Sequence, residues 1–248
     1  KIFLTSVITL AGMLGATSCT DYLDKSPYSD IEENDPYKNF KNFQGFTEEL
    51  YNCIPVVSNS EYHTSFNFGE EDYWEPQELR LFARNIDYGD FWGWTTCYYS
   101  YPSSIRGGKA NSQERSDKGN LWKLCWYGIR KANIGIANLG NLVSATEEER
   151  NLIEGQLYFF RGWFHFMLME WWGGMPYVDQ VLPPDVAPAL SRLTWQECAE
   201  KCVADFDHAI PLLPVDWDQT TAGRATLGLN DTRINKIMAL AYKGKTLL

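Results

Sequence analysis

The stretch from Thr146 to Val178 constrains the fold of this chain more than any other part of the sequence. Thr146 and Glu149 have the spacing of a capping box, in which each side chain covers the other residue's free amide at a helix N-terminus. From Leu157 to Trp172 almost every residue is apolar or aromatic, so a helix here is buried on several sides. Gly173 and Gly174 then predict its C-terminal end. The sequence therefore predicts a central helix enclosed by other helices.

The composition is that of a globular protein with an unusual aromatic content. The 248 residues are 44% hydrophobic and 15% aromatic, with ten Trp and fourteen Tyr, which is more than packing alone needs. Aromatic side chains with polar tips are typical of wet interfaces and ligand clefts. The net charge of −10 argues against a nucleic-acid partner, which needs a basic face, and against electrostatic docking on an anionic membrane.

The N-terminus has the pattern of an export signal. Residues 2–14 form an apolar run of the length of a signal-peptide core, too short to span a bilayer, and small residues follow it. Cys19 comes next, an arrangement that resembles a bacterial lipobox, in which the signal is cleaved before an acylated cysteine. We expect a lipoprotein signal peptide over residues 1–18, lipid attachment at Cys19 and an acidic tether over residues 19–35. Ordinary signal cleavage beside an incidental cysteine is the alternative.

Further amphipathic helices are expected on both sides of the central one. The first is expected from Asp35, as N-cap, to about Ile54. A second covers about 121–140, with an apolar face that includes Trp122 and Trp126, and a third covers about 195–213 behind a second capping box. The last is expected to start near Asn230. Its predicted buried residues are Ile234, Ile237, Met238, Ala241 and Leu248.

The segment 55–119 has no sustained helical period and carries many aromatic residues among Gly, Ser and Pro. A loop of this length in a compact domain is usually functional or disordered, and its aromatic content argues against disorder. Flat aromatic rings suit the C–H faces of sugars, although the same rings can simply pack the loop onto the helices. The candidate glycan-binding residues are Trp74, Trp92, Trp94, Tyr98, Tyr99 and Tyr101.

The cysteines do not form a metal-binding pattern. No CxxC pair is present, and no histidine lies at ligand spacing from the two cysteines of the third helix, so no metal site is expected. We expect most of them to be small core residues, although export would permit disulfides. Those that remain after Cys19 are Cys53, Cys97, Cys125, Cys198 and Cys202.

The sequence gives only weak evidence for groups of residues that could form a catalytic site. Adjacent carboxylates at residues 70–72 point apart on any regular backbone, so a solvated charge cluster is a better interpretation than a glycosidase pair. His165 lies one turn from Arg161 inside the most apolar helix, which favours a hydrogen-bonded core histidine over a catalytic base. Asn133, on a buried helix face, is expected to form a hydrogen bond between helices. No cofactor is expected.

Four segments, taken together, resemble the SusD/RagB family: 121–139, 154–178, 191–214 and 223–248. The lipobox followed by residues 21–24, Asp-Tyr-Leu-Asp, is similar to the usual start of that family. The resemblance implies a tetratricopeptide-like helical scaffold in an outer-membrane lipoprotein of the cell surface. It also implies a glycan ligand, a SusC-like TonB-dependent transporter as partner, and no catalysis. Members of the family are longer, so residues 36–248 are expected to be the N-terminal helical part, without the C-terminal half.

The sequence thus predicts a mostly α, tetratricopeptide-like helical-repeat scaffold with long aromatic-rich loops. The predicted function is glycan capture for import. A helical-repeat interaction scaffold without a ligand of its own is the alternative, and an exported glycosidase is a more distant one.

Overall fold

The structure, a computed structural model, describes residues 35–54, 121–183 and 190–248. All regular elements in these residues are helical, and the only strand-like pairing among them is an isolated bridge between Asn39 and Ser144. The mostly α fold predicted from the sequence is confirmed. In chain order the elements are η1 (Asp35–Tyr37), α2 (Phe40–Asn52), α5 (Leu121–Ala137), η4 (Leu139–Asn141), α6 (Glu147–Trp172), α7 (Trp195–Leu212), η6 (Trp217–Gln219), α8 (Thr221–Arg224) and α9 (Lys236–Leu247).

Helix α6 is the central element of the unit formed by residues 36–248. Its N-terminus has the predicted capping box: the Thr146 amide donates to Glu149 Oε2 at 2.8 Å, and the Glu149 amide donates to Thr146 Oγ1 at 3.2 Å. Every residue from Gly155 to Met169 except Tyr158 is buried. The helix ends at Gly173, whose φ of 74° lies in the region that favours glycine. Local signals therefore fixed both ends of this helix.

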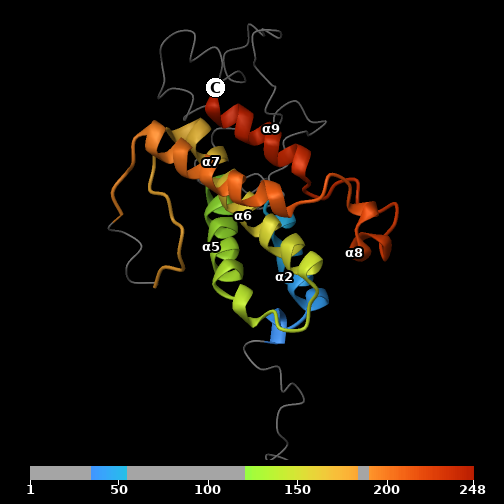
Figure 1. Cartoon of the computed structure of the whole chain (residues 1–248). Helices are drawn as coiled ribbons and strands as arrows, with labels where there is room; N and C mark the ends of the chain where they lie inside the picture. Colours follow the sequence, from blue (N-terminus) through green and yellow to red (C-terminus); the bar gives the residue numbers. More distant parts are fainter. Residues whose placement is uncertain (1–34, 55–120, 184–189) are drawn as a thin grey trace, which may run out of the picture. The chain divides into compact units, whose positions relative to one another are not determined.

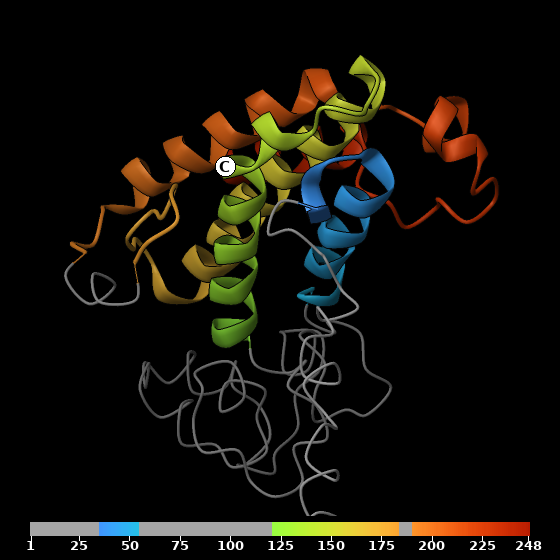
Figure 2. The same cartoon turned by 90° about the horizontal axis from the view of Figure 1, so that it is seen from below.

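The other helices pack around α6 in successive pairs, as a helical-repeat scaffold requires. Helices α2 and α5 contact α6 and each other, α7 contacts α6, and α9 contacts α7 (Figure 1). Seen from below, α5 and α2 flank α6 while α7 crosses over them (Figure 2). The short connection through η4 makes α5 and α6 neighbours, so the start of α5 lies beside the end of α6.

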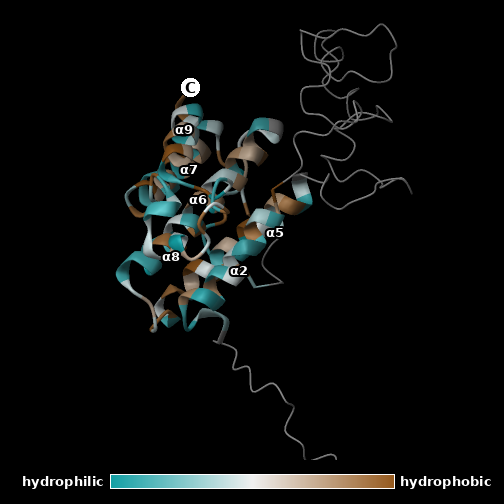
Figure 3. Ribbon diagram, turned by 90° about the vertical axis from the view of Figure 1, so that its right-hand side faces the viewer, coloured by the Kyte–Doolittle hydropathy of each residue, from teal (hydrophilic) through white to brown (hydrophobic). Residues whose placement is uncertain are grey.

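An aromatic core joins these helices. Phe160 stacks on Phe164 at 5.6 Å between ring centroids within α6, and Tyr51 of α2 meets Phe160 edge-on at 4.8 Å. Tyr242 of α9 contacts Phe159 at 6.1 Å. Hydrophilic and hydrophobic residues alternate along α2 and α5, as expected for helices with one buried side (Figure 3). The sequence pattern and the packing therefore agree for this part of the core.

The first helix begins later than predicted. Asp35 and Pro36 lie in η1, and the N-cap of α2 is Asn39, whose Oδ1 accepts from the Asn42 amide at 3.0 Å. The Ser144 amide donates to Lys38 O at 3.0 Å, so residues 38 and 39 pair with the segment before α6. This pairing holds Asn39 in an extended conformation and prevents one continuous helix.

The last helix also differs from the prediction. It begins at Lys236 with Asn235 as N-cap, because the Ile234 backbone is engaged outside the helix: its carbonyl accepts from Trp217 Nε1 and its amide donates to the Tyr51 hydroxyl. The buried face carries Ala239 and Thr246 and not the predicted residues. Of those, Ile234 is buried, whereas Ile237, Met238, Ala241 and Leu248 are exposed.

Two smaller observations concern α5 and α7. Trp122, predicted on the apolar face of α5, is 38% exposed, and Trp195, in the first turn of α7, is 48% exposed. Pro211 lies inside the last turn of α7. The second capping box is present as predicted, with the Thr194 amide donating to Glu197 Oε2 at 2.8 Å.

The described cysteines are core residues, as the sequence suggested. Cys53, Cys125, Cys198 and Cys202 are buried free thiols, and burial raises the pKa of Cys53 to about 11. Cys97 lies outside the described residues. Within the described ranges no helix combines the length and the apolar character needed to cross a membrane.

Candidate functional site

The predicted functional residues lie outside the part of the chain that the structure describes. This holds for the lipid-attachment candidate Cys19 and for the aromatic segment 55–119. The glycan-binding candidates in that segment, Trp74, Trp92, Trp94, Tyr98, Tyr99 and Tyr101, therefore stay predictions. The described helices contain other groups with functional chemistry: a buried polar cluster, two surface hollows and a group of tryptophans.

The buried polar cluster is centred on an ion pair between α6 and α7. Arg161 donates from Nε to Asp205 Oδ2 at 2.7 Å and from Nη2 to Asp205 Oδ1 at 2.5 Å, a two-pronged geometry that is strong for Arg and carboxylate. Arg161 Nη1 also donates to Asn133 Oδ1 of α5 at 3.2 Å. Burial alone would lower the pKa of Arg161, but the hydrogen bonds and charge of Asp205 raise it. Arg161 is therefore charged.

The same cluster holds the segment that follows α6. The Tyr177 hydroxyl donates to Asp205 Oδ2 at 2.5 Å, and burial, followed by the charge of Asp205, raises the Tyr177 pKa well above its ordinary value. Asn133 Nδ2 donates to Val178 O at 2.9 Å. The predicted role of Asn133 is confirmed, since its side chain joins α5 to Arg161 of α6, and it also binds this following segment.

His165 is a core histidine, as its position in the sequence indicated. The Val178 amide donates to its Nε2 at 3.0 Å, so Nδ1 carries the proton and donates to Arg161 O at 2.8 Å. Its ring stacks on Tyr177 at 3.8 Å between centroids. Burial lowers the His165 pKa to about 3. A neutral imidazole with both nitrogens engaged in backbone hydrogen bonds is a structural group and is not poised to transfer a proton.

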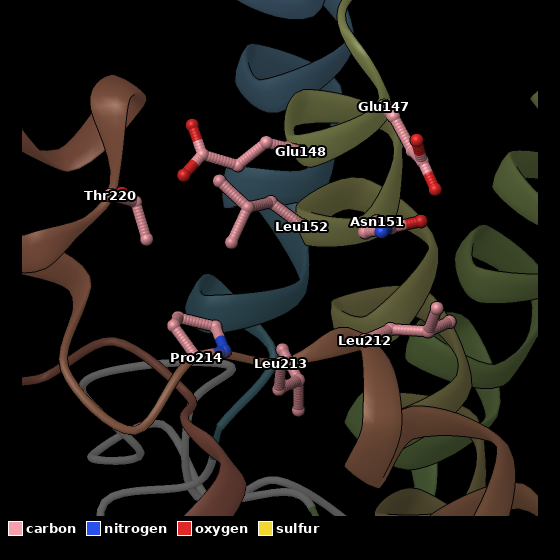
Figure 4. Close-up of a pocket in the computed structure, with 8 residues that line it drawn as sticks. All are labelled: Glu147, Glu148, Asn151, Leu152, Leu212, Leu213, Pro214 and Thr220. Carbon is pink, nitrogen blue, oxygen red and sulfur yellow. The ribbon is translucent and has the colours of Figure 1, made fainter.

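The larger surface hollow lies where the start of α6 meets the end of α7, and its volume is about 320 Å³. Glu148 faces Thr220 across it, and leucine side chains form its floor (Figure 4). Glu148 Oε2 already accepts from the Thr221 amide at 3.0 Å. The lining offers carboxylate acceptors but no aromatic ring on which a sugar could stack. It consists of Glu147, Glu148, Asn151, Leu152, Leu212, Leu213, Pro214 and Thr220.

A smaller hollow of about 200 Å³ lies beside η6. Two of its acidic residues form local hydrogen bonds: Asp216 Oδ1 accepts from the Asp218 amide at 2.9 Å, and Asp218 Oδ1 accepts from Asn230 Nδ2 at 2.6 Å. Among the described residues no group of three or more His, Cys, Asp or Glu is arranged to hold a metal ion.

Tryptophans gather where the start of α5 meets the end of α6. Trp122 contacts Trp172 at 4.9 Å and Trp126 at 5.6 Å between ring centroids. Sequence reasoning assigned Trp122 and Trp126 to helix packing and did not associate them with Trp172. The signal that could have found the group is the antiparallel pairing of α5 and α6, which brings the first turn of one helix to the last turn of the next.

Comparison with known proteins places these features in a family. A SusD-like family model described as "Starch-binding associating with outer membrane" matches residues 21–228. A curated relative, SusD-like protein P2 of Formosa agariphila, is 31% identical over 95 residues, which cover 38% of this chain and 19% of that protein.

Solved structures show the same fold at low sequence identity. A SusD-like protein from Bacteroides fragilis superposes with a TM-score of 0.58 at 18% identity, covering 90% of this chain and 37% of that one. Surface glycan-binding protein A from Bacteroides uniformis gives a TM-score of 0.55 at 18% identity, covering 84% of this chain and 41% of that one. The chain thus spans well under half the length of these relatives. Because the family model covers most of the sequence, the chain belongs to the SusD-like family.

Proposed function

We propose that this protein is a glycan-binding lipoprotein of the outer-membrane surface, which captures oligosaccharide or polysaccharide for import through a SusC-like TonB-dependent transporter. The observation that carries the proposal is the match of residues 21–228 to a family described as starch-binding and associated with the outer membrane. Structural similarity to proteins described as glycan-binding and carbohydrate-binding supports it at the level of fold.

In this proposal the helices are a rigid scaffold and do not carry out chemistry. The features that support this role are the fully engaged Arg161–Asp205 pair and the neutral His165, which leave the polar cluster committed to packing. The glycan is bound by exposed aromatic rings, for which the candidates are Trp92, Trp94 and the other aromatic residues of the segment 55–119.

Binding of a polysaccharide panel to the full-length protein tests the proposal. We expect retention of at least one neutral glycan, starch included in the panel, with no release of reducing sugar. Failure to bind any member would contradict glycan capture and favour the interaction scaffold, and reducing-sugar release would indicate a glycosidase.

Variants of Trp92 and Trp94 test the predicted ligand segment. Removing about 60 Å² of sugar face from water on one ring contributes about 1.5 kcal/mol at about 25 cal/mol per Å². Trp92→Ala or Trp94→Ala should then weaken binding about tenfold without lowering the melting temperature. A large loss of stability in these variants would identify the rings as packing residues.

The membrane anchor is tested separately through Cys19. Palmitate label should enter the full-length protein and disappear in Cys19→Ala, which should also leave the membrane fraction. Unchanged labelling of the variant would exclude acylation at this position. Co-purification with a SusC-like transporter from solubilised membranes tests the proposed partner.

A further inference from the structure

Helices α2 and α5 pack side by side and run in opposite directions (Figure 2). Lys131 Nζ of α5 lies 4.8 Å from the centre of the Phe46 ring of α2. About one turn further along α2, the Tyr127 hydroxyl donates to Glu49 Oε1 at 3.2 Å. Each step toward the end of α2 is therefore matched by a step toward the start of α5.

The same register, continued by one turn, sets two cysteines opposite each other. They are Cys53, the residue that ends α2, and Cys125, in the second turn of α5. Their exposed fractions are 2% and 0%, and both belong to one hydrophobic core. Burial, followed by the charge of Cys53, raises the pKa of Cys125 well above its ordinary value, which agrees with two neighbouring thiols.

The thiol of Cys53 is engaged only weakly in the reduced protein. Its Sγ donates to Glu49 O, in the preceding turn, at 3.2 Å. A thiol is a weak hydrogen-bond donor, so rotation of the side chain about its Cα–Cβ bond gives up little. The sulfur of Cys53 is therefore available to the facing helix.

We propose that Cys53 and Cys125 form a disulfide that joins the end of α2 to α5. The bond forms by exchange with an oxidant that itself carries a disulfide. The two thiols lose two protons and two electrons as their sulfurs join, and the S–S bond of the oxidant is reduced to two thiols. The exchange takes place while the chain folds, since the attacking group is a thiolate and burial keeps these thiols protonated. This inference rests on the proposed function only for the oxidising surroundings of an exported protein.

The disulfide closes a ring of about 70 residues, which contains the segment 55–119. Closing a ring of this size removes conformational entropy from the unfolded chain and so stabilises the folded protein. The bond also fixes the two ends of the segment that carries the predicted glycan-binding residues.

A second cysteine pair provides a matched control. Cys198 and Cys202 lie in successive turns of α7, and both are buried. Cβ atoms four residues apart on a helix are about 5–6 Å from each other, whereas a disulfide needs about 3.5–4.5 Å. The two cysteines of α7 should therefore remain thiols under conditions that oxidise Cys53 and Cys125.

Peptide mapping of the full-length protein tests the pairing independently of where the protein is located. The protein is reduced while unfolded and refolded with reduced and oxidised glutathione. Its remaining thiols are then alkylated before digestion with trypsin. We expect the peptide 42–80, which contains Cys53, to be linked to the peptide 124–130, which contains Cys125. Alkylation of both, or linkage of either one to another cysteine such as Cys97, would overturn the inference.

The same map of protein alkylated directly in cells tests the location. We expect the linked peptides there as well. Linkage in the refolded protein but not in cells would support the pairing and contradict the export on which the proposed function depends.

Melting temperatures separate the effect of the bond from that of core packing. Protein refolded with oxidised glutathione should melt roughly 5–15 °C higher than protein kept reduced. Cys125→Ala should melt at the same temperature in both conditions. Cys198→Ala removes a buried thiol too, but it should keep the difference. No difference in the wild type, or one that persists in Cys125→Ala, would overturn the disulfide.

Discussion

Arg161 of α6 and Asp205 of α7 form an ion pair that is almost completely removed from water, with side chains 9% and 7% exposed. Breaking a buried pair by removing one partner leaves an uncompensated charge, which typically costs about 3–5 kcal/mol. Asp205→Asn should lower the free energy of unfolding by about that amount, as measured by urea denaturation.

Asp207 provides the matched control, since it lies on the same helix and pairs with Lys243 at 2.5 Å, but its side chain is 51% exposed. Exposed pairs contribute at most about 1 kcal/mol, so Asp207→Asn should be nearly neutral. Equal losses in the two variants would show that burial of the Arg161–Asp205 pair is not what stabilises the helix contact.

Stability should fall in mild acid because of His165. Its pKa is about 3 in the folded protein and about 6.5 when unfolded, so below pH 6.5 the unfolded chain binds more protons. The free energy of unfolding then decreases as the pH falls, by up to about 1.4 kcal/mol per pH unit, until the folded pKa is reached. Denaturation experiments between pH 7 and pH 5 measure this slope. This window is chosen because carboxylates titrate at lower pH.

The same measurement on His165→Gln isolates the contribution of this histidine. The variant should be less stable at pH 7 because backbone partners are lost, but its stability should depend less on pH in this window. The chain's other histidines are present in both proteins, so the difference in slope reports His165. If the free energy of unfolding depends on pH with the same slope in the two proteins, His165 is not a buried neutral imidazole.

Helices α5 and α6 approach each other closely at Gly128. A Cβ atom there would lie 2.3 Å from Phe164 Cε2, and Phe164 is completely buried. Gly128→Ala should therefore destabilise the protein by about 1–3 kcal/mol through overpacking. Gly45 of α2 has no atom within 4 Å of the corresponding position, so Gly45→Ala should stabilise by about 0.5–1 kcal/mol. Thermal denaturation measures both effects. If the melting temperatures of the two variants shift in the same direction, α5 and α6 do not approach closely at Gly128.

Trp163 reports on the core around α6. It is 6% exposed and contacts Phe164 at 5.2 Å and Tyr242 of α9 at 6.0 Å between centroids. Trp163→Ala should lower the free energy of unfolding by about 3–5 kcal/mol. At the exposed position 195, Trp195→Ala should lower the free energy of unfolding by no more than about 0.5 kcal/mol. A loss below about 1 kcal/mol for Trp163→Ala would mean that α6 is not the centre of the core.

The sequence predicted those features whose causes are local. The capping boxes at Thr146 and Thr194 and the glycine at position 173 act within one helical turn, so they could be identified from spacing alone. The start of α2 could not, because Asp35 and Asn39 are both acceptable N-caps. The choice between them is made by a hydrogen bond from Ser144 to Lys38, more than one hundred residues apart in the sequence.

The buried face of α9 was mispredicted for a related reason. Apolar residues occur on two sides of this helix, and the periodicity of the sequence does not tell which side faces the core. Tyr242 settles the orientation through contacts with Phe159, Trp163 and Phe166 of α6. Likewise, Arg161 in an apolar helix required a partner, but only the fold shows that the partner is Asp205.

The hydrogen bonds between the end of α6 and the start of α7 determine where this chain can accept inserted residues. The Leu193 amide donates to Met175 O at 3.3 Å, and Arg192 donates to Trp172 O and Gly174 O at 2.6 and 2.8 Å. Between Gly174 and Arg192, Asn133 holds Val178 and Arg130 holds Leu182, so much of the connecting segment is itself bound to α5. Because the entropy of loop closure grows only with the logarithm of length, residues can be added between Leu182 and Arg192 at little cost in stability. Such a site lets evolution change the surface of the scaffold while the helices stay as they are.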